Sequence, residues 1–308
     1  MDFGPDYIIH ASGAENQVMI YAATTRNMVE EARRIHQTTP VMTAALGRLL
    51  TAGSIMGSML KNEDDLITLQ IKCSGPAGGL TVTACPDGSV RGYAVHPDAD
   101  MPPKARGKLD VGGAVGSGEL SVIRDLGLKE PYVGTVQLVS GEIAEDLTYY
   151  FASSEQVNSS VGLGVLVDTD NTVRQAGGFI LQLMPFASEE LVSSLEKNLS
   201  ELPPVTTMLD DGLDPESIIM KVLKGHDINF YDRVDAEYKC RCSRERVERA
   251  VISIGSREIQ EMIDDGEDVE VNCQFCGRHY TFSVDELKGL LARADRHRQT
   301  SVPDEADR

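Results

Sequence analysis

The stretch "LITLQIKCSGPAGGLTVTACPDGSVRGYAV", residues 66–95, decides the fold of most of this chain. Apolar and polar residues alternate in three short runs, and this period of two is typical of a half-buried β-strand. The runs are separated by SGPAGG (74–79) and PDG (86–88), whose glycines and prolines indicate turns. The stretch therefore predicts three antiparallel strands in a meander.

The residues before the meander, from Asn27 to Lys61, have a helical pattern. Asn27 is a predicted N-cap, with Glu30 three residues later, and Pro40 divides the pattern into two helices. The apolar segment 41–60, VMTAALGRLLTAGSIMGSML, is long enough to span a membrane. Arg48 lies near its middle, however, and its many small residues favour a tightly packed core helix.

Further strands are predicted after the meander in PYVGTVQLV (131–139), VGLGVLV (161–167) and VRQAGGFILQLMP (173–185). Two segments between strands receive other assignments: GEIAEDLTYY (141–150) is predicted to be a solvated helix start, and VGGAVGSGE (111–119) a loop. Helices before and among strands predict an α+β fold. We expect residues 1–180 to form an N-terminal core of mixed helices and antiparallel sheet.

Residues 181–238 are predicted to be an acidic, amphipathic helical linker. Within them, residues 188–238 hold 12 acidic and four basic residues of a chain whose net charge is −19. Ser188 and Asp214 are placed to cap two short helices, and Pro215 suits the first helical position. Helices this short are marginal in water, so they require a surface to pack on. The acidic surface argues against nucleic acid as a partner.

Four of the six cysteines lie in the last 70 residues, in KCRC (239–242) and CQFC (273–276). Residues 243–266 predict helix, with Ser243 and Ser256 as caps, and residues 269–282 predict a hairpin whose turn carries the second pair. A module this small requires a staple, which one Zn²⁺ ion held by four thiolates supplies. Residues 239–308 are therefore predicted to be a small C-terminal zinc-binding module with four cysteine ligands, Cys240, Cys242, Cys273 and Cys276.

Other cysteine chemistries fit less well. A thioredoxin-like site uses one Cys-x-x-Cys pair, a zinc deaminase needs a His-x-Glu motif that this chain lacks, and a catalytic zinc keeps one position open. The N-terminus has no signal-peptide pattern, so we expect a cytoplasmic protein. In the cytoplasm, cysteine pairs are more often metal or redox sites than structural disulfides. The tight Cys-x-Cys spacing, and the ability of each pair to oxidise internally, favour a redox-sensitive zinc over a purely structural one.

The array of Cys-x-Cys followed about thirty residues later by Cys-x-x-Cys resembles that of the bacterial redox-regulated heat-shock chaperones, the 33 kDa chaperonin family. Residues 130–156, EPYVGTVQLVSGEIAEDLTYYFASSEQ, look like the signature block of that family. Residues 164–185 resemble the segment that closes its core, and residues 40–57 resemble its early helix. The resemblance covers essentially the whole chain.

The resemblance implies a holdase that is not an enzyme, uses no ATP and is inactive when reduced and zinc-bound. Oxidation would release the zinc, form the disulfides Cys240–Cys242 and Cys273–Cys276, and unfold the module and the redox-sensitive linker. The exposed surface would bind unfolding client proteins, with residues 1–180 serving client binding and dimerisation in an oxidised homodimer. The chain has no P-loop motif, consistent with no nucleotide partner, and we expect no membrane partner.

The remaining candidates carry weaker signals. Cys73 and Cys85 lie outside the motif and are predicted to be buried, inert thiols. The six histidines, His297 among them, show no metal-ligand spacing. One hypothesis from another class stays open, namely a hydrolase or transferase on the N-terminal core with a purely structural zinc tail. Release of the metal by mild peroxide would separate the two hypotheses.

Overall fold

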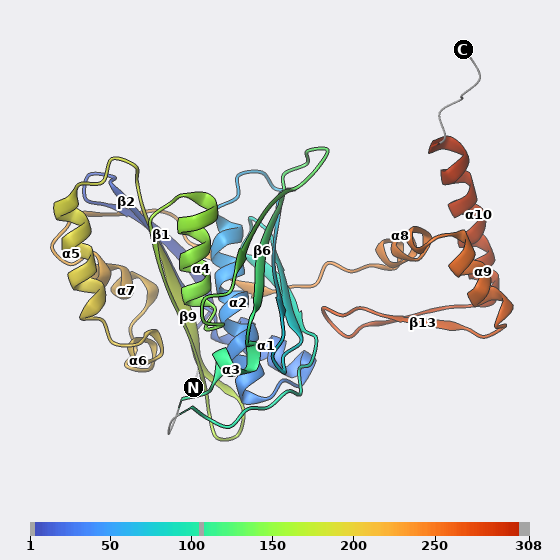
Figure 1. The fold of residues 1–308 in the computed structure, drawn as a ribbon, viewed down its shortest axis with the longest axis horizontal. Coiled ribbons are helices and arrows are strands. Elements are labelled where there is room, and N and C mark those ends of the chain that lie inside the picture. Colours follow the sequence, from blue (N-terminus) through green and yellow to red (C-terminus); the bar gives the residue numbers. More distant parts are fainter. Residues whose placement is uncertain (1–3, 105–107, 302–308) are drawn as a thin grey trace, which may run out of the picture. The chain divides into compact units, whose positions relative to one another are not determined.

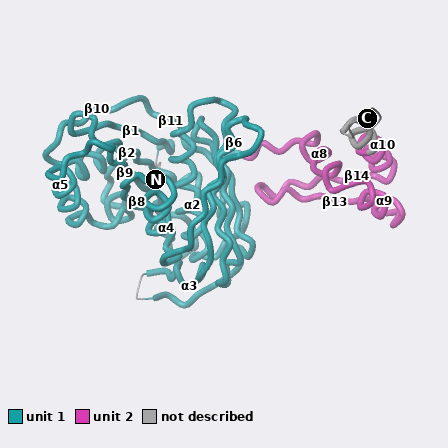
Figure 2. Tube along the Cα trace, turned by 45° about the horizontal axis from the view of Figure 1, so that its top comes forward, with its two compact units in different colours: residues 1–239 teal, residues 240–308 magenta. Residues whose placement is uncertain are grey.

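The computed structural model describes residues 4–104 and 108–301, and in residues 295–301 only the backbone. The first three residues and the side chain of His297 thus lie outside the described part. The chain forms two compact units, residues 1–239 and residues 240–308 (Figures 1 and 2). Residues 181–238, the predicted linker, belong to the first unit. Their separate role as a redox-sensitive linker stays a prediction.

The first unit contains two six-stranded sheets among its described residues (Figure 1). The first sheet has the order β10-β1-β2-β9-β8, β11 also pairs with β1, and every pair is antiparallel. Its strands are β1 (Tyr7–Gly13), β2 (Val18–Thr24), β8 (Ser159–Val167), β9 (Val173–Leu183), β10 (Ile228–Phe230) and β11 (Val234–Asp235). The two strands predicted at 161–167 and 173–185 are confirmed as β8 and β9.

The second sheet has the order β12-β5-β4-β3-β6-β7. Its strands are β3 (Leu66–Cys73), β4 (Gly79–Ala84), β5 (Ser89–Ala94), β6 (Gly118–Asp125), β7 (Tyr132–Gln137) and β12 (Glu237–Tyr238). The predicted meander is confirmed, because β3, β4 and β5 pair antiparallel in sequence order. The α+β fold class is confirmed as well. The short strand β12 pairs parallel with β5, so the end of the predicted linker is held at the edge of this sheet.

Helix α2 (Pro40–Ser58) lies between the two sheets (Figure 1). Sixteen of its 19 residues are buried, which confirms the predicted core helix. Arg48 is the charged residue of this helix, and its Nη1 pairs with Glu142 Oε2 at 2.8 Å. Within the described ranges, no helix combines the length and apolar character required to cross a bilayer.

Small residues let α2 approach the second sheet closely. A Cβ atom added at Gly53 would lie 2.6 Å from Cγ1 of Val82 on β4. A Cβ atom at Gly57 would lie 2.7 Å from the carbonyl oxygen of Cys85. Real Cβ atoms do not pack this closely, so larger residues at either position would push helix and sheet apart.

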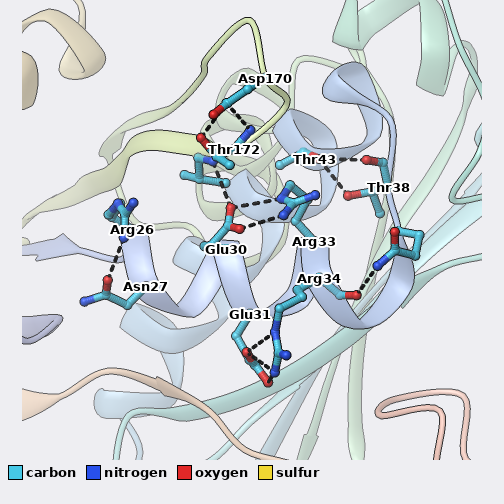
Figure 3. Close-up of polar contacts among 12 residues, drawn as sticks. Arg26, Asn27, Glu30, Glu31, Arg33, Arg34, Thr38, Thr43, Asp170 and Thr172 are labelled. Atoms are coloured by element: carbon cyan, nitrogen blue, oxygen red, sulfur yellow. Dashed lines mark hydrogen bonds and ion pairs between the residues drawn. The ribbon is translucent and has the colours of Figure 1, made fainter.

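Helix α1 (Arg26–His36) begins two residues earlier than expected, because Thr25 is its N-cap. The predicted cap at Asn27 is wrong: its Nδ2 donates to the carbonyl oxygen of Gly4, and the Met28 N–H donates to the Asp6 carboxylate at 2.7 Å. Further along the helix, Glu30 accepts hydrogen bonds from the Arg33 guanidinium (Figure 3) and from the Val173 N–H at the start of β9. Glu30 thereby ties α1 to the first sheet.

Two assignments between the strands need correction: residues 111–119 are not a loop, and residues 141–150 contain the predicted helix start but are not solvated throughout. Residues 111–119 contain the short helix α3 (Val111–Val115), capped by Asp110, and then the start of β6. In the acidic run 141–150, helix α4 (Ala144–Tyr150) continues into a π-helix, η1 (Phe151–Glu155), but Asp146 is fully buried rather than solvated. Its carboxylate accepts the N–H groups of residues 139, 140 and 143 at 2.7–3.0 Å. Four donors converging on one side chain explain the burial, since a buried carboxylate requires such partners.

The predicted linker contains the helices α5 (Glu189–Ser200), α6 (Val205–Asp210) and α7 (Pro215–Val222), but its last part forms the short strands β10, β11 and β12 rather than helix. The caps at Ser188 and Asp214 are confirmed, since both side chains accept a backbone N–H of their helix. The helices pack on the face of the first sheet that is turned away from α2 (Figure 1). They form a second core there, which includes Ile9, Val18, Ile20, Phe179, Leu181, Leu191, Leu195, Met208, Leu209, Ile218, Ile219 and Val222. The sheet therefore has a hydrophobic core on each side.

The second unit consists of α8 (Arg244–Ile254), α9 (Ser256–Asp264), the hairpin β13 (Val269–Asn272) and β14 (His279–Phe282), and α10 (Val284–Ser301). The predicted hairpin is confirmed, as is the Ser243 cap. The Ser256 cap is wrong, because Gly255 occupies the N-cap position with a φ of 113°. The buried core is small and consists of Val247, Val251, Ile259, Tyr280, Phe282, Leu287, Leu290 and Ala294.

Asp6 gives the first unit a pH-dependent stability. The residue is only 7 % exposed, and burial raises the pKa of its carboxyl from 3.8 to about 6. The folded state binds this proton more tightly than the unfolded chain, so this contribution to stability is lost as pH rises from about 4 to about 6. Asn at this position is neutral at every pH. Between pH 4 and pH 6.5 the free energy of unfolding of Asp6→Asn, measured with denaturant, should therefore rise by roughly 1–3 kcal/mol relative to that of the unmodified protein.

The matched control is Asp64→Asn, which removes an exposed carboxylate from the same unit. Its stability difference from the unmodified protein should not change over the same pH interval. A parallel pH dependence for both variants would mean that Asp6 is not the titrating group.

Candidate metal centre

Four thiols from two separate segments of the second unit converge at one point. The Sγ atoms of Cys240, Cys242, Cys273 and Cys276 all lie within 4.8 Å of one another. Each member of the first pair contacts one member of the second, at 3.7 Å between Cys240 and Cys273 and 3.5 Å between Cys242 and Cys276. The structure therefore brings together all four cysteines that the sequence spacing singled out.

The second pair is positioned by the turn of the β13–β14 hairpin. The Cys276 and Gly277 N–H groups both donate to the Cys273 carbonyl, at 3.3 and 2.8 Å, and the Cys273 N–H donates to the Arg278 carbonyl at 2.9 Å. Gly277 has a φ of +67°, in the left-handed region that glycine adopts without strain. This compact turn points two thiols to the same side, where both can ligate one ion.

The first pair lies directly before α8. Ser243 caps that helix by accepting the Arg246 N–H, and the Arg246 side chain reaches back to donate to the carbonyl of Arg241 at 3.0 Å. Arg244 stacks on the Phe282 ring at 4.6 Å and pairs with Glu286 at 2.6 Å. These contacts fix the short loop that carries Cys240 and Cys242 against the hairpin.

The arrangement fits a tetrahedral metal ion. Sulfur ligands about 2.3 Å from the centre of a tetrahedron lie about 3.8 Å from one another. The Cys240–Cys273 and Cys242–Cys276 sulfur separations are 3.7 and 3.5 Å, close to that edge length. Four sulfur donors at this spacing can complete the coordination shell of one ion, and no further protein ligand is required. His279 in the hairpin pairs with Glu270 instead, at 2.9 Å.

The thiols of the cluster differ in acidity. Burial raises the pKa of the Cys240 thiol and that of Cys276. Burial also opposes ionisation of Cys242, but hydrogen bonds from Tyr280 and the neighbouring thiols outweigh it and lower the pKa of that thiol to about 7. The Tyr280 hydroxyl donates to Cys242 Sγ at 3.1 Å. Sequence reasoning gave Tyr280 only a place in the hairpin, because alternation predicts which face a residue occupies and not which atom it contacts.

The other two cysteines lie in the first unit. Cys85 is buried as predicted, whereas the prediction is wrong for Cys73, which lies at the end of β3 and is half-buried. Burial raises the pKa of the Cys73 thiol, which disfavours its reactive thiolate form. That both thiols are inert stays a prediction.

Comparison with known proteins gives one consistent result. Residues 6–283 match the model of a family described as Hsp33 protein. A 33 kDa chaperonin of Lachnoclostridium phytofermentans is 56% identical over 290 residues, which cover 94% of this chain and 99% of that protein. A 33 kDa chaperonin of Agathobacter rectalis is 55% identical, over 92% of this chain and 99% of that protein.

The fold gives the same result. The crystal structure of a 33 kDa chaperonin, a heat shock protein 33 homologue from Thermotoga maritima, superimposes with a TM-score of 0.84. That protein is 36% identical in sequence, and the match covers 94% of this chain and 99% of the solved one.

The cluster should bind a divalent metal under reducing conditions. Protein stripped by a chelator and titrated with Co²⁺ should develop the charge-transfer absorption of thiolate-bound cobalt. Cys276→Ser should weaken Co²⁺ binding by at least about tenfold, because it removes one of four sulfur ligands. Cys73→Ser removes a thiol outside the cluster and should titrate like the unmodified protein. Equal affinities for the two variants would contradict metal binding at the cluster.

Proposed function

The chain belongs to the Hsp33 family, and on that premise we propose that it is a redox-regulated chaperone that holds unfolding proteins without using ATP. Its partners are unfolded or partly unfolded client proteins in the cytoplasm, and it acts by binding rather than by catalysis. The observation that carries the proposal is the convergence of four free thiols on one point in a small unit. In a reducing compartment such a cluster holds a metal, and under oxidation the same thiols are consumed.

In the reduced, inactive state the four thiolates of Cys240, Cys242, Cys273 and Cys276 hold one Zn²⁺ ion. The sulfur separations suit zinc, which prefers four sulfur or nitrogen ligands in a tetrahedron. Zinc binding contributes roughly 10–16 kcal/mol of folding free energy in small zinc-dependent peptides. A unit with as small a buried core as this one depends on such a contribution.

Oxidation converts the thiols into the disulfides Cys240–Cys242 and Cys273–Cys276. For each pair, one peroxide molecule accepts two electrons from two thiolates and two protons from solvent, and leaves as two water molecules. All four sulfurs lie within 4.8 Å, so pairing within each segment requires only local movement. The two disulfides leave no thiolate for the metal, and the second unit loses its main source of stability.

Activation then extends to the predicted linker. Helices α5, α6 and α7 are short and owe their order to the apolar face of the first sheet. Their detachment would expose both their own buried side chains and that sheet face, a surface suited to unfolding clients. We also propose that the oxidised protein is a homodimer.

The function is tested by light scattering from a thermally unfolding client protein. Reduced, zinc-loaded protein is compared with protein oxidised by warm peroxide, and neither sample contains ATP. Only the oxidised form should suppress aggregation, and it should sediment as a dimer. The control variant Cys73→Ser/Cys85→Ser keeps the cluster and should be activated in the same way. If the reduced and oxidised forms behave alike, the cysteines are scaffolding and the function lies elsewhere in residues 1–239.

A further inference from the structure

Strand β8 ends the first sheet and has one unpaired edge. Among the described strands it pairs only with β9. The Val161 N–H points away from β9, since it donates to Thr148 Oγ1 on α4 at 3.2 Å. Because backbone groups alternate along a strand, the N–H groups of Leu163 and Val165 point the same way. Neither makes a hydrogen bond within the described part of the chain.

A groove runs along this edge. It comprises two hollows of about 810 and 360 Å³ that share Ser160 and Leu199 as lining residues. One wall comes from α2 and α4, and the other from the segment 199–207 between α5 and α6. Among the described residues, the charged ones that line the two hollows are Arg48, Lys108, Glu145 and Glu196, two of each sign. The rest of the described lining is largely apolar.

The side chains of β8 divide between the two walls. Val161, Leu163 and Val165 pack into the core around α2. Gly162 and Gly164 face the other way and present no side chain, so the Phe179 ring and Thr206 lie close to the strand. The backbone of β8 thus lines the groove directly at these two glycines.

We propose that the edge of β8 takes an extended segment of an unfolded client polypeptide as an additional strand of the first sheet. The proposal rests on the function proposed above and assigns to it a site and a mode of recognition. Main-chain N–H and C=O groups would supply the affinity, and the apolar walls would accept alternate side chains. The outward N–H groups of Leu163 and Val165 would start a ladder with the main chain of the client, and such a ladder depends little on client sequence.

The predicted linker controls access to this edge. Leu202, Pro203 and Pro204 line the groove, and proline next to an open strand is a common way to prevent unwanted pairing. Release of the linker upon oxidation would remove that wall while β8 keeps its ladder with β9. The edge would then be open only in the active state.

A backbone-directed peptide tests the proposal on unmodified, oxidised protein. The probe is a fluorescein-labelled peptide of ten alternating valine and threonine residues flanked by lysines. Its counterpart is N-methylated at two adjacent central residues, which interrupts hydrogen bonding along both edges and keeps every side chain. Fluorescence anisotropy should show binding of the plain peptide and about tenfold or greater weakening by methylation. Equal affinities would overturn strand addition.

A matched pair of β8 variants tests the site. Leu163→Pro removes an outward N–H and places a ring where the added strand would lie, without removing a bond to β9. Leu163→Ala removes the same side chain and keeps the N–H. Oxidised Leu163→Pro should bind the peptide about tenfold more weakly and protect a heated client less well than Leu163→Ala.

The two variants also separate the alternative outcomes. If both variants protect the client equally and bind the peptide equally, β8 is not the site. If Leu163→Pro becomes monomeric yet still captures clients, β8 is not the site either, because a second copy of the chain would then occupy the edge. Should Leu163→Pro fail to fold, as judged by circular dichroism, the methylated peptide on unmodified protein decides. If the unmodified oxidised protein does not protect the client, the proposed function is contradicted. The comparison of plain and methylated peptides then still tests strand addition.

Discussion

The first unit depends on a helix that has almost no solvent-facing side. Helix α2 packs on both sheets, and 16 of its 19 residues are buried. Close approach is possible because Gly53 and Gly57 leave room for Val82 and for the backbone at Cys85. The single arginine of the helix, Arg48, forms an ion pair with Glu142, just before α4. The spacing of the two sheets, and with it the position of β8, follows from this packing.

A second consequence concerns the first sheet, whose two faces belong to different cores. Ile8 and Ile180 face α2, whereas Ile20 and Leu181 face the helices of the predicted linker. Detachment of α5, α6 and α7 would therefore uncover alternate residues of β1, β2 and β9 and leave the core around α2 in place. The sheet thus takes part in two separate hydrophobic cores, one shared with α2 and one shared with the helices of the predicted linker.

Much of this architecture was predictable, because local signals specify it. Alternation predicted the meander, β8 and β9, and side-chain caps marked the starts of α5, α7 and α8. Cysteine spacing alone identified the four residues that converge. Strands β1 and β2 escaped prediction because they are covered on both faces and show no alternation. The burial of Asp146 and the bond from Tyr280 to Cys242 depend on neighbours that only the folded chain brings together.

The short strand β12 has a thermodynamic consequence for the linker. Tyr238 donates its hydroxyl proton to the Gly92 carbonyl, and the Lys239 N–H donates to the Val90 carbonyl, each at 2.8 Å. The helices α5, α6 and α7 are therefore tethered on both sides, by β9 before them and by β10, β11 and β12 after them. When detached, this segment is a closed loop rather than a free tail. The free energy that it gains from chain entropy is therefore smaller by roughly 3 kcal/mol. That constraint favours re-docking, because the detached segment stays close to the sheet face on which it packs.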